Sequence, residues 1–287
     1  MPIIKVSDLT YCYGKGTPFE KVALDNVSFD IEKGEFVAII GHTGSGKSTL
    51  VSHLNGLIRP QSGSVELEGE DIFKKGYNLR AARFAVGLVF QYPEYQLFEE
   101  TVFKDIAFGP KNMGLSDEEI KERVVWAAKA LEIKPELLNK SPFELSGGQK
   151  RRVAIAGVIA MRPKVVVLDE PAAGLDPVGR DRVMRLISNY RNKTGNSVVV
   201  VSHSMEAAAK YADKVVVLNE GKLFMCAKPD EVFARADEIE KIGLSLPPVT
   251  RLVQALIKKG FNLADNIYTA KDAAEALLSL KAKGGKE

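Results

Sequence analysis

The segment GHTGSGKST, residues 41–49, has the residue types and the spacing of a loop that binds phosphate groups. Its glycines allow the backbone to turn tightly so that N–H groups face phosphate oxygens, and the start of the following helix adds positive potential. We expect Lys47 to contact the β- and γ-phosphates of a nucleotide and Ser48 to ligate Mg²⁺. A glycine-rich turn without a ligand is the alternative, but a buried-strand pattern before the loop and a helix pattern after it favour nucleotide binding. The predicted nucleotide-binding residues of this loop are Gly41, His42, Thr43, Gly44, Ser45, Gly46, Lys47, Ser48 and Thr49.

The segment VVVLDE, residues 165–170, supplies two carboxylates at the end of another buried-strand pattern. Because parallel strands bring their carboxyl ends to one edge of a sheet, these acids are expected beside the phosphate-binding loop. We expect Asp169 to hold Mg²⁺ through water and Glu170 to be the base that polarises the attacking water. An acidic pair that only caps the following turn is the alternative, and the neighbouring loop makes it the weaker one.

The segment LSGGQKRRVAIAGVIA, residues 145–160, predicts a second helix whose start is suited to receive an anion. Ser146 has the residue type of an N-cap, and Gly147 and Gly148 expose backbone N–H groups. One triphosphate already has its binding loop. A second phosphate-facing helix start therefore raises the question of whose nucleotide it meets.

Apolar runs rich in β-branched residues predict strands buried on both faces, at residues 36–40, 85–90, 165–168, 197–201 and 214–218. Helical patterns lie between them, and one of these begins with Ser116 and Glu119 in capping-box spacing. This alternation predicts an α/β fold with a mostly parallel sheet. We assign residues 1–243 to one nucleotide-binding domain, with a helical subdomain at residues 92–160. Residues 244–287 form a helical extension that is too short to fold alone, and we expect it to contact another subunit or the main domain.

Composition limits the class of protein. Lys and Arg number 40 against 37 for Asp and Glu, so charge gives no indication of a nucleic-acid partner. The two cysteines, Cys12 and Cys226, have no metal-like spacing, which fits a reducing compartment. The sequence contains neither a secretory signal pattern nor an apolar run of about 18 residues, so another protein would have to hold this chain at a membrane.

The succession of GHTGSGKS, LSGGQ and VVVLDE resembles the ATPase subunits of ABC transporters. The resemblance implies a P-loop NTPase fold of the ABC ATPase type, with ATP and Mg²⁺ as ligands. It also implies a head-to-tail dimer, in which LSGGQ of one subunit presses on the γ-phosphate held by the other. The residues that would do so here are Ser146, Gly147, Gly148 and Gln149.

The same resemblance assigns roles to further residues. Gln91 matches the glutamine that senses Mg²⁺ and water, Asp176 matches an interface residue, and His203 matches the switch histidine that contacts the γ-phosphate. The family stacks adenine on an aromatic residue near the N-terminus. Both Tyr11 and Tyr13 fit, with packing in the core as the alternative for each, and we favour Tyr13 because it is nearer to the following turn.

Residues 91–112 resemble, over their whole length, a segment of the ATPase subunits of energy-coupling factor transporters, which import vitamins and transition-metal ions. The likeness is greater to the second of the two ATPase paralogues in such systems. It implies a paralogous ATPase partner or a second copy of this chain, an integral membrane coupling subunit and a substrate-binding membrane subunit. The chain would lie peripherally at the cytoplasmic face of the cell membrane, without nucleic acid.

In this family the segment after the glutamine leads to the docking site of a membrane-subunit helix, and we name residues 92–105 the docking segment. Its apolar contact surface is expected to come from Tyr92, Tyr95, Leu97 and Phe98. Its acidic side chains, expected to meet basic residues of that helix, are Glu94, Glu99 and Glu100. An internal hydrophobic plug of the helical subdomain is the alternative for the aromatic residues.

Other functions would use some of the same motifs. A soluble ABC-type ATPase acting on ribosomes or DNA would carry two phosphate loops or long heptad insertions, whereas this sequence has one loop and no sustained heptads. A P-loop kinase would have no use for LSGGQ. A nucleotide-gated scaffold without catalysis would be distinguished by Glu170→Gln. Loss of turnover with retained ATP-dependent dimerisation would support hydrolysis as the function, whereas unchanged downstream activity would favour the scaffold.

Overall fold

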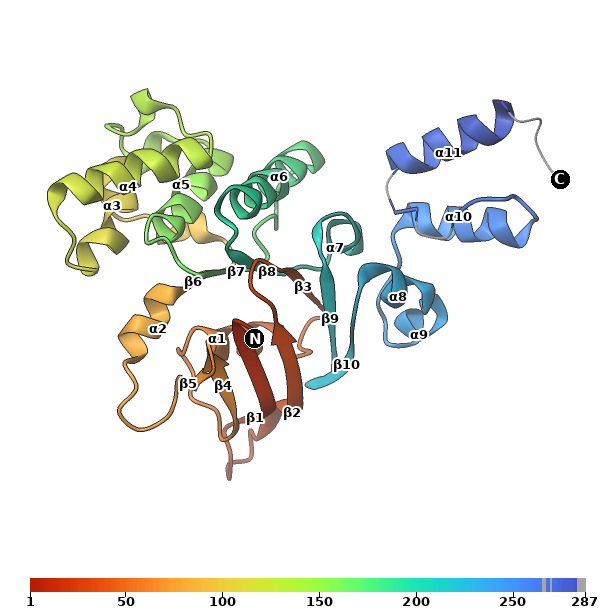
Figure 1. The fold of residues 1–287 in the computed structure, drawn as a ribbon, viewed down its shortest axis with the longest axis horizontal. Helices are drawn as coiled ribbons and strands as arrows, with labels where there is room; N and C mark the ends of the chain where they lie inside the picture. Colours follow the sequence, from red (N-terminus) through yellow and green to blue (C-terminus); the bar gives the residue numbers. More distant parts are fainter. Residues whose placement is uncertain (265–266, 269, 283–287) are drawn as a thin grey trace.

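A six-stranded sheet carries the phosphate-binding loop and the acidic pair (Figure 1). The computed structural model describes residues 1–264, 267–268 and 270–282. The strands lie in the order β10 (Lys222–Ala227), β9 (Lys214–Asn219), β3 (Phe36–Ile40), β8 (Ser197–Val201), β7 (Val165–Asp169) and β6 (Val86–Val89). All neighbouring pairs are parallel except β9 with β10. The predicted mostly parallel sheet is therefore confirmed.

The register of this sheet brings the functional segments to one edge. Val201 at the end of β8 lies beside Ile39 of β3 on one side and Asp169 of β7 on the other. Every residue of β3, β7 and β8 is buried, as expected for strands covered on both faces. The loops after these three strands therefore leave the sheet side by side.

A second, antiparallel sheet lies over the first, in the order β2 (Lys21–Ile31), β1 (Ile4–Tyr13), β4 (Ser62–Leu67) and β5 (Glu70–Asp71). Helix α1 (Lys47–Leu54) packs between the sheets, since its Leu50 and Leu54 share one apolar core with residues of both. The apolar runs in the sequence do not reveal this sheet, because its long strands mix polar residues with apolar ones and contain register shifts. It places Tyr13 near the phosphate-binding loop.

Helices connect β6 to β7 and form the lobe at the upper left of Figure 1. They are η1 (Pro93–Gln96), α3 (Val102–Asn112), α4 (Asp117–Ala130), η2 (Pro135–Leu137), η3 (Pro142–Glu144) and α5 (Gly147–Ile159). The capping box at the start of α4 forms as expected between Ser116 and Glu119. Apolar residues of α3, α4 and α5 share one core with β7 and β8 of the sheet, so α5 is anchored on β7, which ends in the acidic pair, and on its neighbour β8.

The remaining helices flank the sheet and extend the chain. α2 (Leu79–Ala85) precedes β6, whereas α6 (Pro177–Thr194) and α7 (Met205–Tyr211) follow β7 and β8. The C-terminal helices are α8 (Pro229–Ala234), α9 (Ala236–Lys241), α10 (Pro248–Lys258) and α11 (Ala270–Ala282). Between the last two, Tyr268 packs against Phe233 of α8 and donates a hydrogen bond of 2.6 Å to Asp230. No helix within the described ranges has the length and apolar character to cross a bilayer.

Candidate functional site

The phosphate-binding loop forms a tight turn between β3 and α1. Gly46 has a φ of +100°, and a Cβ atom there would lie 2.3 Å from the Ala23 carbonyl oxygen, so only glycine fits. The Lys47 ammonium donates hydrogen bonds of 2.8 Å to the carbonyl oxygens of Gly41 and His42. Burial lowers the pKa of Lys47, while the carboxylates of Glu170 and Asp169 oppose that shift. Lys47 is thus preorganised at the bottom of the loop.

A cavity of about 320 Å³ opens above this loop. Six of the nine predicted loop residues line it, and four other segments contribute Tyr13, Gln91, Glu170 and His203. The other three loop residues do not line the cavity. The carbonyl groups of Gly41 and His42 accept the hydrogen bonds of Lys47, and the Ser45 side chain is fully buried. Lys21 and Ala23 also line the cavity, and nothing in the sequence motifs indicates them, because they lie on the strand that follows Tyr13.

The two candidate tyrosines have different environments. Tyr13 lines the cavity, is 43% exposed and places its hydroxyl 3.3 Å from Thr49 Oγ1. The Tyr11 ring is half-buried and meets the rings of Tyr13 and His53 edge-on, at centroid distances of 4.9 and 5.0 Å. Tyr13 is therefore the one of the two that is placed to meet a base in the cavity.

The carboxyl end of β7 places two acids with different surroundings. Asp169 is buried and accepts a hydrogen bond from the Ser48 side chain, and burial raises the pKa of its carboxyl group against the effect of this bond and of Lys47. Glu170 follows in the left-handed region, with a φ of +49°. Its carboxylate contacts His203 Nε2 at 2.5 Å and accepts a hydrogen bond of 3.3 Å from Gln91 Nε2. Glu170 is thus held by side chains from two neighbouring strand ends.

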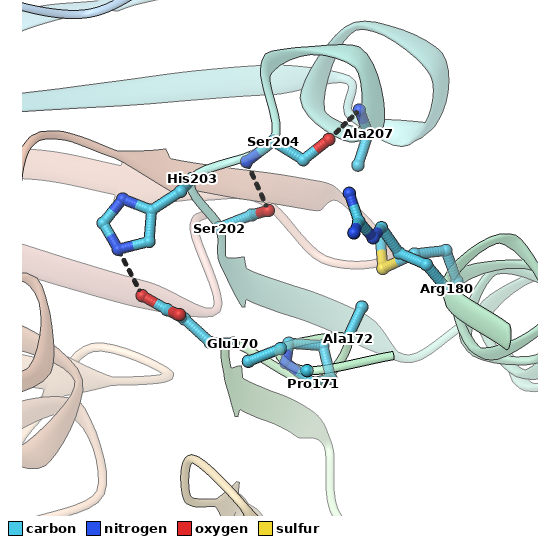
Figure 2. Close-up of a pocket in the computed structure, with 11 residues that line it drawn as sticks. Glu170, Pro171, Ala172, Arg180, Ser202, His203, Ser204 and Ala207 are labelled. Atoms are coloured by element: carbon cyan, nitrogen blue, oxygen red, sulfur yellow. Dashed lines mark hydrogen bonds and ion pairs between the residues drawn. The ribbon is translucent and has the colours of Figure 1, made fainter. Parts of the chain in front are cut away.

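Figure 2 shows Glu170 and His203 facing each other across the ends of β7 and β8, seen from a neighbouring cavity of about 160 Å³. Both residues line this second cavity as well as the one above the phosphate-binding loop. They therefore form part of the wall between the two spaces.

The oxygen groups at this strand edge fit Mg²⁺. The Ser48 hydroxyl and the Asp169 carboxylate are already in contact, and the Gln91 amide lines the same cavity. Hard oxygen donors of this kind, together with phosphate oxygens, are the usual surroundings of Mg²⁺ beside a nucleotide. Among the residues that the structure describes, no three His, Cys, Asp or Glu side chains gather as a metal site, so phosphate oxygens and water would complete the coordination.

The LSGGQ segment lies outside this constellation. Ser146 caps α5 in a capping box with Gln149, and a Cβ atom at Gly147 or Gly148 would meet nothing within 4 Å. None of these residues lines the cavity of the phosphate-binding loop. Asp176 is also exposed, and it caps α6 through a bond of 2.6 Å from Gly179 N. Both helix starts therefore lie outside the cavity above the phosphate-binding loop of their own chain.

The docking segment differs from the expectation in two places. Glu94 is not available to an outside partner, because Arg151 of α5 contacts both of its carboxylate oxygens and leaves it 14% exposed. Leu97 is mostly buried in the helical core, and it also lines the apolar groove beside the docking segment. The Glu100 carboxylate contacts Lys104 one turn further along. Tyr92, Tyr95 and Phe98 are exposed as expected, at 42%, 84% and 60%.

A groove of about 370 Å³ lies beside these aromatic residues, lined by apolar side chains of α3 and α5 together with Phe98 and Asp105. Asp105 Oδ1 accepts the backbone N–H groups of Phe98 and Glu99. Its Oδ2 is buried and has no hydrogen-bond partner in the described part of the chain. Burial raises the pKa of this carboxyl group. Asp105 could not be identified from the sequence as a buried acid, because the helix pattern alone does not show which of its side chains are buried.

Comparisons with known proteins give a consistent picture. The family model described as "ABC transporter" matches residues 24–173 of this chain. The energy-coupling factor transporter ATP-binding protein EcfA2 of Caldanaerobacter subterraneus subsp. tengcongensis is 54% identical over 278 residues, which cover 97% of each chain. The protein of the same name from Clostridium perfringens is 53% identical, over 96% of this chain and 98% of its own.

Solved structures share the fold. The structure of cbiO1 from Clostridium perfringens, described as part of the ABC transporter complex cbiONQ, has a TM-score of 0.75 and 40% identity, over 88% of this chain and 99% of its own. A dimeric ATP-binding cassette in a post-hydrolysis state with ADP and Pi has a TM-score of 0.69 and 30% identity, over 79% of this chain and 98% of its own.

Proposed function

This chain belongs to the ABC transporter family as an ATP-binding subunit of the energy-coupling factor type, and we propose that it couples ATP hydrolysis to the import of vitamins or transition-metal ions through membrane subunits. The observation that carries the proposal is the single strand edge at which Lys47, Asp169, Glu170 and His203 meet. The LSGGQ helix start of the same chain lies outside the cavity that these residues surround. This arrangement supports a site that two subunits complete together.

The residues of the cavity divide the chemistry among them. Lys47 would exchange its bonds to the two loop carbonyls for bonds to phosphate oxygens. Ser48 and Asp169 would hold Mg²⁺, whose charge offsets that of the phosphates when it is bound. Tyr13 would stack on the adenine ring.

Hydrolysis would use Glu170 as the base. The water oxygen bonds to the γ-phosphorus, the bond from that phosphorus to the β–γ bridging oxygen breaks, and ADP and phosphate result. Glu170 takes the proton that the water loses. Gln91 and His203 hold the Glu170 carboxylate in the structure. When ATP is bound, both side chains would also form hydrogen bonds to the water and the γ-phosphate.

A second ATPase subunit would complete each site. The exposed N–H groups at Ser146, Gly147 and Gly148, together with the dipole of α5, suit the γ-phosphate held by the partner. We propose a paralogous ATPase as this partner, with a second copy of the same chain as the alternative. Asp176 would lie near the interface.

The membrane subunit would dock on the groove between α3 and α5. Exposed aromatic rings beside it offer apolar contact. The unpartnered Asp105 Oδ2 offers a buried carboxylate to an arginine of a membrane-subunit helix, which would satisfy it. Through this contact the chain would be held at the cytoplasmic face of the membrane.

Glu170→Gln in the complete complex tests the proposal. Loss of a general base costs about 100-fold or more in rate, so we expect ATP hydrolysis and substrate uptake to fall together by that factor while ATP-dependent subunit association persists. Glu206→Gln, which removes an exposed carboxylate, provides the control, and we expect its turnover to be unchanged. Recovery of the chain without any integral membrane companion, or uptake that continues in Glu170→Gln, would contradict the proposal.

A further inference from the structure

The Arg151 side chain connects segments that are far apart in the sequence. It lies five residues after Ser146 in α5 and is only 2% exposed. Its Nε and Nη2 atoms donate to the two carboxylate oxygens of Glu94, at 2.9 and 2.5 Å. Its Nη1 atom donates to the carbonyl oxygens of Pro171 and Ala173, at 3.3 and 2.5 Å. One planar guanidinium thus joins the docking segment to the turn directly after Glu170.

The buried ion pair between Arg151 and Glu94 is expected to add little stability but to fix the relative positions of the groups that it joins. Removing two charges from water is costly, and an apolar pair of the same size often stabilises a core as well or better. The guanidinium, however, is rigid and presents its donors in a fixed plane, so its partners are held in a defined relative position. The burial of Arg151 therefore points to a role in positioning.

Two further contacts join the same segments. Gln91 Nε2 donates to Glu170 Oε2 at 3.3 Å. The ring of Tyr92 lies over Gly174, because a Cβ atom at Gly174 would be 3.7 Å from Tyr92 Cε1. Tyr92 and Glu170 both have left-handed backbone conformations, with φ of +53° and +49°. Such conformations persist in non-glycine residues when the surroundings hold them, and each of these residues lies at one end of this connection.

We infer that Arg151 is a positioning residue through which the docking segment controls the placement of Glu170. The inference rests on the proposed function. A shift of Glu94 on docking would move the guanidinium and, with it, the carbonyl groups of Pro171 and Ala173. Because Ala173 N donates to the Glu170 carbonyl oxygen at 3.1 Å, this turn moves as a unit and carries the catalytic carboxylate with it.

Two conservative variants of the pair test the inference. Glu94→Gln keeps an acceptor opposite Arg151 but removes the charge that fixes it, and Arg151→Lys keeps the charge but cannot reach all four acceptors. The control is Glu35→Gln, which weakens another half-buried pair, Glu35–Lys214 at 2.9 Å, at the opposite end of β3. The complete transporter complex is assayed for kcat and KM of ATP hydrolysis, at a temperature at which thermal unfolding shows every variant folded.

We expect both variants of the pair to lower kcat with KM for ATP unchanged, because the phosphate-binding loop is not touched. A misplacement of about 1 Å can reduce a rate by about 100-fold, so a fall of about 10- to 100-fold is expected. Glu35→Gln is expected to lower only the unfolding temperature. A merely structural role for Arg151 would likewise lower the unfolding temperature and leave kcat unchanged.

The inference is overturned if Glu94→Gln and Arg151→Lys turn over as fast as Glu35→Gln. It is also overturned if their KM rises while kcat holds. If the complex that contains Arg151→Lys does not assemble, the kcat of the Glu94→Gln complex alone tests the inference. A wild-type complex that hydrolyses no ATP would overturn the proposed function itself and this inference with it, whereas normal wild-type turnover with unaffected variants overturns the inference alone.

Discussion

At the scale of single residues, the site holds its reactive groups in place through contacts that ATP would replace. Lys47 contacts two loop carbonyl groups, and Glu170 is held between Gln91 and His203. Groups held in this way need little reorganisation when the substrate arrives, which is an efficient form of electrostatic stabilisation.

The assignment of Tyr13 as the base-stacking residue leads to a selective prediction. Stacking of a base on an aromatic ring is worth about 1–3 kcal/mol by alanine substitution, so Tyr13→Ala should weaken ATP binding by about 5- to 150-fold. Tyr13→Phe keeps the ring and should bind ATP nearly as well as the wild type. Calorimetric titration with ATP and with inorganic tripolyphosphate measures both effects, and an equal loss of affinity for the two ligands would contradict stacking.

Most of the residues that meet at the candidate site could be placed there from the sequence, since their spacing is local and their positions at strand ends follow from apolar runs. Lys21 and Ala23 could not be predicted, because their place beside the loop depends on the second sheet, whose strands show no continuous apolar run. The partner of Glu94 could not be predicted either, because Arg151 lies 57 residues away.

At the scale of elements, the helical lobe shows which local signals suffice and which do not. The start of α4 was predictable, because Ser116 and Glu119 form a capping box within four residues. The docking segment was predictable only as a mixture of aromatic and acidic residues. Which of them face outward depends on α3 and α5, which bury Leu97 and, with Arg151, most of Glu94.

Asp105 on α3 has one carboxylate oxygen, Oδ2, without a hydrogen-bond partner among the described residues, and we expect this oxygen to set stability against docking. Burial raises the pKa of Asp105 above its value in the unfolded chain. The folded state therefore binds the proton more tightly, and its stability falls as the pH rises from the unfolded pKa through the folded one. Asp105→Asn removes the buried charge and should stabilise the isolated chain by about 1 kcal/mol at neutral pH.

The same substitution should weaken recovery of the membrane subunit, since an arginine would lose its charged partner. Thermal unfolding of the isolated chain and co-purification of the membrane subunits measure the two effects, with the exposed Asp117→Asn on α4 as the control. A destabilised chain that still binds its membrane subunits normally would show that Asp105 has only a structural role.

At the scale of the whole molecule, one chain contains two phosphate-facing helix starts, and its nucleotide cavity uses only one of them. Lys47 lies at the start of α1 in the cavity, whereas Ser146 at the start of α5 lies outside it. Head-to-tail pairing of two ATPase subunits would bring the second helix start to the partner's nucleotide. Sites that are half-complete in each chain would make closure of the pair depend on ATP.

The structure of the Glu170→Gln complex saturated with Mg²⁺ and ATP tests this account most directly. We expect the γ-phosphate that lies on the partner's phosphate-binding loop to contact the backbone N–H groups at Gly147 and Gly148 and the Ser146 side chain of this chain. Finding those residues distant from every bound triphosphate in the closed complex would contradict the account.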